Sequence, residues 1–270
     1  MVVQHNLSAM NTNRQMGVVT SALQKSTEKL SSGYKINRAA DDAAGLSISE
    51  KMRSQIRGLN KASDNAQDGI SLIQVAEGAL NETHSILQRM NELATQAAND
   101  TNTSVDRQSI KDEIEQLNAE LDRISTTTQF NKQDLLTGKF SGKLQVGALE
   151  GQTMDLKIST AVSSTGLKVK DIKVSTNENA GKAMKSIQDA IESVSKQRSK
   201  LGAIQNRLEH TINNLDTNAE NTQAAESRIR DTDMADEMVQ YSKNNILSQA
   251  GQSMLAQANQ QTQGVLSLLG

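Results

Sequence analysis

A heptad pattern between Met52 and Ala97 constrains the fold of this chain more than any other feature of its sequence. Apolar residues recur at every seventh position over this stretch, and a second row of apolar or small residues accompanies them. A repeat sustained over so many heptads is typical of a coiled-coil helix. The chain has no proline, and the glycines in this stretch are isolated. We therefore predict one uninterrupted helix of roughly 55 residues, about 80 Å long at 1.5 Å per residue.

A second heptad row begins near Ala180 and provides a packing partner for this helix. The two rows have matching registers, so we predict that they pair as long antiparallel rods. The fold class predicted is therefore mainly α. The residues expected in the coiled-coil seam are Leu59, Ile73, Leu80, Leu87, Ile187, Val194, Leu201, Leu208 and Leu215.

The spacing of apolar residues changes in the segment between the two predicted rods. A helix is predicted from about Ser104 to Thr127, where Thr103 and Asp106 are spaced as a capping box, and this helix should fold back antiparallel after a short turn. From residue 129 to 176, apolar and polar residues mostly alternate in three runs, the last of them between Leu167 and Val174. This alternation predicts a small β region of two or three strands.

The two ends of the chain share an unusual lack of charge. The first helical segment runs from about Gln4 to Leu30 and ends near Gly33, and no charged side chain occurs between Asn244 and Gly270. Both ends are amphipathic, so we predict that they pair with each other. A two-helix unit buries too little apolar area to be firmly stable alone. We therefore expect a homopolymer, which is an open helical filament if the contacts are head-to-tail.

The composition excludes several classes of protein. Two Phe, two Tyr and no Trp or Cys favour thin helical packing and exclude disulfides; disorder is the competing interpretation, and the strong periodicity argues against it. A net charge of −2 provides no basic surface for nucleic acid. No stretch approaches 18 apolar residues, so we expect neither membrane insertion nor a Sec-type signal.

Candidate catalytic residues are few. His5, His84 and His210 are isolated in the sequence, and a solvated helix face explains the latter two. The acidic residues after Arg230 resemble the start of a calcium loop, but Asp236 stands where such a loop needs glycine and Ser242 where it needs glutamate. We therefore predict no enzyme activity, no cofactor and no metal site.

Several long motifs, in the same order along the chain, resemble bacterial flagellin. They are LSSGYKINRAADDAAGL at 30–46, NAQDGISLIQ at 65–74, EGALN at 77–81, LQRMNELA at 87–94, TQFN at 128–131, MLAQAN at 254–259 and VLSLL at 265–269. The resemblance implies a structural subunit of the flagellar filament that serves swimming motility. It also implies an inner filament-core domain of residues 1–42 plus 231–270, and a coiled-coil domain of residues 43–230. Many flagellins insert large outer domains after the β region, and this chain resembles a short form that lacks them.

The same resemblance implies partners and a location. A flagellin is expected to be secreted through the flagellar type III apparatus, without a cleaved Sec signal, to an extracellular flagellum. Its expected partners are copies of itself, a flagellar export chaperone, and hook-associated and cap proteins. Three residues, Arg89, Leu93 and Glu113, match positions that flagellins present to Toll-like receptor 5 of a host. The resemblance also implies that these residues lie between subunits in the filament. Those matching the region sensed by inflammasome receptors are Val265, Leu266, Leu268 and Leu269.

Two other functions are compatible with parts of this pattern. A hook-filament junction protein shares the terminal architecture, but it ends a filament instead of propagating one. A signalling coiled coil such as a chemoreceptor hairpin should have membrane segments and an uninterrupted helical tip, and this sequence has neither. The filament subunit therefore remains the expected function.

Overall fold

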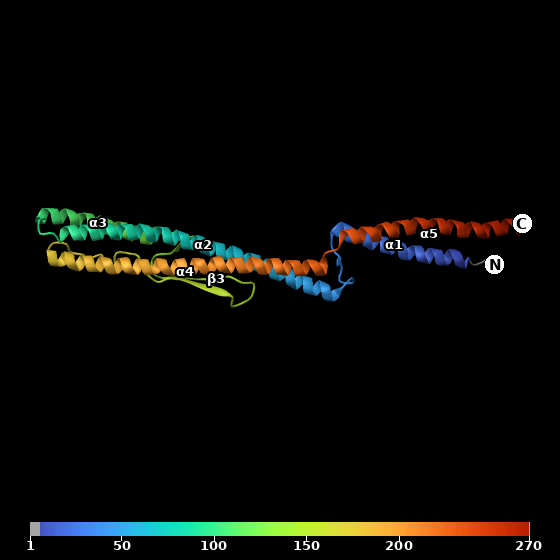
Figure 1. The fold of residues 1–270 in the computed structure, drawn as a ribbon, viewed down its shortest axis with the longest axis horizontal. Coiled ribbons are helices and arrows are strands. Elements are labelled where there is room, and N and C mark those ends of the chain that lie inside the picture. The colour runs from blue at the N-terminus through green and yellow to red at the C-terminus, as the bar shows by residue number, and fades with distance from the viewer. Residues whose placement is uncertain (1–5, 270) are drawn as a thin grey trace. The chain divides into compact units, whose positions relative to one another are not determined.

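The computed structural model describes the backbone of residues 6–269 and the side chains of residues 6–261. Helices form most of it (Figure 1), and two short β-hairpins follow α3 and precede α4 in the order of the chain. The predicted mainly α fold class is confirmed. The elements are α1 (Leu7–Ser32), α2 (Ala43–Ala97), α3 (Ser104–Thr127), β1 (Gln129–Phe130), β2 (Gln133–Asp134), β3 (Phe140–Gln145), β4 (Thr153–Ile158), α4 (Asn177–Arg230) and α5 (Met234–Leu269).

Contacts divide the chain into two compact units. We define the terminal unit as residues 1–54 and 221–270, and the rod unit as residues 55–220. The division falls inside α2 and α4, so the ends of these two long helices belong to the terminal unit. The domain division implied by the resemblance, with boundaries at 42/43 and 230/231, follows the ends of the helices and stays a prediction.

In the rod unit, α2 and α4 pair in antiparallel fashion. Ser63 Oγ donates a hydrogen bond to Asp216 at 3.0 Å, and farther along α2 Glu77 pairs with Arg198 at 3.6 Å, so positions rise on one helix as they fall on the other. Heptad side chains fill the space between the two helices because each turns toward its partner. All nine seam residues predicted from the sequence are buried.

Helix α3 folds back onto the same core after a short turn. The predicted capping box is present: the Thr103 hydroxyl accepts from the Asp106 amide, and the Asp106 carboxylate accepts from the Thr103 amide at 2.9 Å. Hydrogen bonds from the Thr103 hydroxyl and amide lower the pKa of Asp106 below its usual value. Arg107 Nε then donates to the Ala97 carbonyl at 3.2 Å, which satisfies a free carbonyl at the end of α2. Hydrogen bonds therefore fix the turn between α2 and α3 both at the end of α2 and at the start of α3.

The β region consists of two antiparallel hairpins. β3 pairs with β4 from Phe140↔Ile158 to Gln145↔Thr153, and alternate residues of β4 are buried. The β3–β4 connection approaches α2 closely at Gly58, where an added Cβ would lie 2.8 Å from the Ala148 Cβ. A glycine at that position allows the hairpin to pack against the helix.

The first two alternating runs form β3 and β4, whereas the third run, Leu167–Val174, forms no strand. Because β1 and β2 precede them, the described β region has four strands and not the two or three expected. The reason why the third run forms no strand is local hydrogen bonding. The Leu167 amide donates to the Ser163 carbonyl at 2.9 Å, and Lys168 adopts a φ of 60°, which a strand does not permit. Leu167, Val169 and Val174 are still buried and Ile172 is half-buried, so the alternation indicates burial and not strand geometry.

In the terminal unit, α1 and α5 lie side by side and antiparallel (Figure 1). Asn6 Nδ2 donates to the Ala258 carbonyl at 2.9 Å near one end, and Lys29 pairs with Glu237 at 3.4 Å near the other. Helix α1 ends at Gly33, whose φ of 75° is the left-handed conformation that glycine adopts without strain. The predicted pairing of the N- and C-terminal helices is confirmed.

Candidate interaction surfaces

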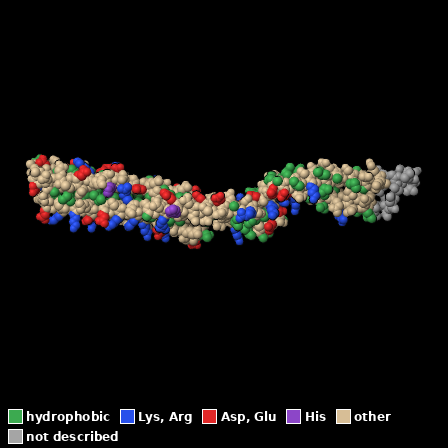
Figure 2. Space-filling model, in the orientation of Figure 1, with side chains coloured by type: hydrophobic (Ala, Val, Ile, Leu, Met, Phe, Trp, Pro, Cys, Tyr) green, Lys and Arg blue, Asp and Glu red, His purple; other side chains and the backbone are tan. Residues whose placement is uncertain are grey.

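The terminal unit carries most of the large exposed hydrophobic side chains among the described residues. Figure 2 shows such side chains along the part of the molecule that α1 and α5 form. Single exposed aliphatics are normal, but a series on two adjacent helices marks an interaction surface. We call the following set the terminal apolar surface: Leu7, Met10, Val18, Met234, Met238, Val239, Ile246, Leu247 and Met254.

The terminal unit has almost no core of its own. Among its described residues, the only buried hydrophobic side chains are those of Ile36 and Ala258, whereas the seam of the rod unit is buried throughout. Burial of apolar area stabilises a fold by about 25 cal/mol per Å², and a unit that buries so little gains little from it. The pairing of α1 with α5 is therefore only weakly stabilised within one chain.

A largely buried arginine holds together the chain segments that enter and leave the two terminal helices. The Arg230 side chain is only 13% exposed, lies 4.8 Å from the centre of the Tyr34 ring, and donates to Glu50 at 2.9 Å. The Lys35 amide donates to the Arg230 carbonyl at 2.7 Å, which fixes the backbone there as well. The sequence alone marks Arg230 only as the residue before an acidic run, because no spacing rule links it to residues nearly two hundred positions away.

In the rod unit, Arg89 and Glu113 lie together at an exposed edge between α2 and α3. Arg89 Nε donates to Glu113 Oε1 at 2.9 Å, and Nη1 donates to Glu92 at 3.2 Å. The hydrogen bond with Glu113, followed by that with Glu92, raises the pKa of the Arg89 guanidinium above its usual value. The Arg89 side chain remains 51% exposed, so the ion pairs contribute little stability and leave the guanidinium accessible.

Leu93 is buried, unlike Arg89 and Glu113, with which it is predicted to form an interaction site. Its side chain is 2% exposed and belongs to the main hydrophobic core. It lines a groove of about 460 Å³, together with Arg89 and Glu113, so the structure brings the three residues together with Leu93 at the buried side. A partner that binds in this groove therefore contacts mainly the polar and charged side chains that line it.

The remaining predicted residues are placed as follows. The side chains of Val265, Leu266, Leu268 and Leu269 lie outside the described residues, as does His5. His84 contacts Gln88 on the same helix at 3.0 Å. Within the described residues, no group of three or more potential metal ligands occurs. The same residues contain no helix that is long and apolar enough to span a membrane.

Comparison with protein families gives two matches. The bacterial flagellin N-terminal helical region matches residues 3–141, and the bacterial flagellin C-terminal helical region matches residues 184–269. The two matches leave out the extreme ends and residues 142–183, which contain most of the β3–β4 hairpin, the segment after it and the first residues of α4.

Full-length relatives agree with these matches. A flagellin of Halalkalibacterium halodurans is 57% identical over 273 residues and covers 100% of both chains. A flagellin of Bacillus subtilis is 51% identical over 304 residues, again covering 100% of both chains. A 31.3 kDa flagellar filament core protein of Treponema maltophilum is 50% identical over 286 residues, with 100% of both chains covered.

Two solved structures share the fold. The Bacillus cereus flagellin crystal structure matches with a TM-score of 0.51 and 32% identity, covering 60% of this chain and 94% of that one. A putative flagellar hook-associated protein from Vibrio parahaemolyticus matches with a TM-score of 0.60 at 12% identity, covering 71% of this chain and 100% of that one. The second likeness is one of fold alone.

Proposed function

This chain belongs to the bacterial flagellin family, and on that basis we propose how its copies assemble. As a flagellin, it is a structural subunit of the flagellar filament, an extracellular structure. We propose that the terminal apolar surface is covered by the terminal units of neighbouring subunits, with different patches of the surface meeting at each contact. Head-to-tail contacts between copies then generate an open helical filament.

One observation carries this proposal: among its described residues, the terminal unit exposes a series of large aliphatics and buries only two hydrophobic side chains, those of Ile36 and Ala258. Packing on further copies removes this surface from water, and each large aliphatic side chain that becomes buried contributes about 1.5–3 kcal/mol. The absence of charge from Asn244 to Gly270 supports the same conclusion, because no charged group has to be desolvated there.

Amide hydrogen exchange tests the proposal. In dilute monomer, α1 and residues 234–261 of α5 are expected to exchange rapidly, because segments with few buried apolar contacts open at little free-energy cost. In the polymer the same amides should become protected. The segment from Ile187 to Leu208 serves as the internal reference and should be protected in both states. Strong protection of α1 and α5 in dilute monomer, or no gain in the polymer, contradicts the proposal.

The hook-filament junction function is not favoured. The relatives that match over their full length are flagellins and filament core proteins. The likeness to a hook-associated protein is one of fold at 12% identity, and it carries no functional argument.

We also propose the partners that the family resemblance implies. The subunit is exported through the flagellar type III apparatus without a cleaved Sec signal, and it meets an export chaperone and the hook-associated and cap proteins. Free monomer is recognised by Toll-like receptor 5 through the groove lined by Arg89, Leu93 and Glu113, and the inflammasome receptor region is Val265, Leu266, Leu268 and Leu269. The exposed guanidinium of Arg89 supports the first of these contacts.

A receptor-reporter assay tests this contact. The change Arg89→Ala should lower the response at least about tenfold, as expected when an arginine anchor worth more than about 1.4 kcal/mol is lost. Arg123→Ala is the matched control, because Arg123 is also exposed and paired with a carboxylate on its own helix. Equal responses from the two variants would exclude the proposed role of Arg89.

A further inference from the structure

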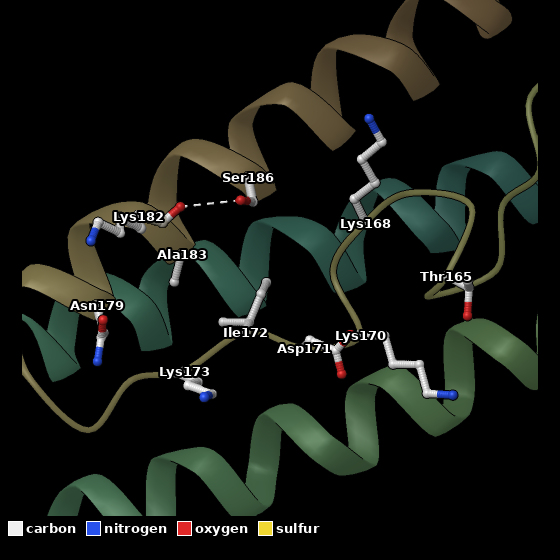
Figure 3. Close-up of a pocket in the computed structure, with 10 residues that line it drawn as sticks. All are labelled: Thr165, Lys168, Lys170, Asp171, Ile172, Lys173, Asn179, Lys182, Ala183 and Ser186. Atoms are coloured by element: carbon white, nitrogen blue, oxygen red, sulfur yellow. Dashed lines mark hydrogen bonds between the residues drawn. The ribbon is translucent and has the colours of Figure 1, made fainter.

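A lysine-lined hollow in the rod unit has no part in the functions described above. It lies between the segment 165–173 and α4, and its volume is about 400 Å³ (Figure 3). Lys168, Lys170 and Lys173 come from the segment, and Lys182 comes from α4. The volume falls within the range of about 300–1,000 Å³ that is typical of small-ligand sites.

The backbone that carries these lysines is held in place. Leu167 and Val169 are buried, so the alternating Lys168 and Lys170 face outward. Asn118 Nδ2 of α3 donates to the Val169 carbonyl at 3.2 Å, which anchors the segment to the helix behind it. The backbone that carries the lysines is therefore fixed before any ligand arrives, which lowers part of the entropy cost of binding.

The hollow has a surplus of positive charge. Among the described residues, Lys168, Lys170 and Lys173 form no ion pair, whereas Lys182 pairs with Glu178 at 2.7 Å. One carboxylate, that of Asp171, also lines the hollow. The whole chain carries a net charge of −2, so this concentration of unpaired cations departs from the average of the molecule. Lysine ammonium groups bind phosphate and sulfate as point charges.

The uncharged residues in the hollow, and a second hollow beside it, indicate which kind of ligand fits. Figure 3 shows Ile172 and Ala183 in its middle, with the lysines around them, and Asn179 and Ser186 supply an amide and a hydroxyl. A second hollow of about 250 Å³ adjoins the first, shares Lys168 and Ser186 with it, and contains Asp189. An elongated ligand therefore fits, with its anionic groups in the first hollow and an uncharged portion beside Asp189.

We propose that this pair of hollows binds a saccharide that carries phosphate or sulfate esters. The lysines pair with the ester groups, the amide and hydroxyls bind ring hydroxyls, and the apolar floor packs against ring C–H groups. An acidic surface of a second copy of the chain is the competing occupant. It is less favoured because the carboxylates of α3 are largely paired already, as in Glu113 with Arg89 and Glu120 with Arg123.

Calorimetric titration of the full-length monomer tests the proposal, which does not depend on filament assembly. The probes are a trisulfated heparin disaccharide, inorganic pyrophosphate, uncharged maltose and phosphatidylglycerol vesicles. The first two should bind, with an affinity that falls as salt rises. Maltose should not bind. Binding to the vesicles without binding to the disaccharide overturns the proposal in favour of a lipid headgroup.

The decisive variant combines Lys168→Gln, Lys170→Gln and Lys173→Gln. It should weaken disaccharide binding at least about tenfold, because three cations around the ester groups are lost. The matched control combines Lys61→Gln, Lys111→Gln and Lys196→Gln, which removes the same charge from exposed lysines outside the hollows and should change binding less than about twofold. Circular dichroism verifies that both variants are folded.

Three results overturn the proposal. The first is the absence of binding by the unchanged chain at millimolar probe. The second is an equal loss in the two triple variants, which means that the probe senses only overall charge. The third is unchanged disaccharide binding by the hollow variant together with failed filament growth, which identifies the hollow as a contact between copies of the chain.

Discussion

The change Leu201→Asp is expected to destabilise the rod unit by about 4 kcal/mol or more, a large part of the stability of a typical domain. Leu201 is fully buried in the main core, among the side chains of α2 and α4. Aspartate removes the apolar contacts and places a carboxylate in this hydrophobic core. The midpoint of urea or thermal unfolding, followed by circular dichroism, should fall sharply, and Leu80→Asp on the opposite helix should have a similar effect.

The neighbouring residue gives a matched control. Lys200 is exposed on the same helix, so Lys200→Asp introduces the same side chain one position away without burying it. Its effect on the free energy of unfolding should remain within about 0.5 kcal/mol. If Leu201→Asp and Lys200→Asp unfold at the same midpoint, the two rods are not held together by the seam.

The change Ile246→Asp is expected to prevent filament growth while leaving the monomer intact. Ile246 is 66% exposed on α5, so aspartate meets water in the monomer and costs little there. In the filament the carboxylate must be buried against neighbouring subunits. The monomer concentration needed for elongation should rise at least about tenfold, since the burial of one isoleucine contributes about 1.5–3 kcal/mol. Val239→Asp, at another site of equal exposure, should behave alike.

The control for this prediction retains the apolar side chain. Ile246→Leu should elongate filaments at nearly the same concentration as the unchanged chain, because a swap that conserves volume is well tolerated. Unfolding of all these variants should be unchanged, because the residues lie outside the core of the rod unit. Normal elongation by Ile246→Asp would mean that this part of α5 is not covered in the filament.

Much of the fold could be predicted from the sequence because its long helices follow periodic rules. The heptad rows predicted the two rods, the spacing of Thr103 and Asp106 predicted the capping box, and Gly33 predicted the end of α1. Each of these signals is local, and each is independent of how distant parts of the chain meet. The uncharged ends likewise predicted the pairing of the terminal helices, which needs no knowledge of side-chain geometry.

Other features depend on tertiary contacts that spacing does not reveal. The run from Leu167 to Val174 alternates like a strand, but local turns and the positive φ of Lys168 place its apolar residues in the core without a strand. The contact of Arg230 with Tyr34 joins residues far apart in the chain. The buried position of Leu93 in the groove and the clustering of lysines beside α4 also emerge only once the helices are packed.

Seeded elongation of the unchanged chain tests the central claim, that copies of this subunit build a filament through their terminal units, most directly. Purified monomer is added to short filament fragments, and filament length and residual monomer are measured by electron microscopy and sedimentation. The fragments should lengthen continuously while soluble monomer falls to a constant concentration. If monomer binds only to the ends of the seeds and stops their growth, the chain behaves as a junction protein, and the claim is contradicted.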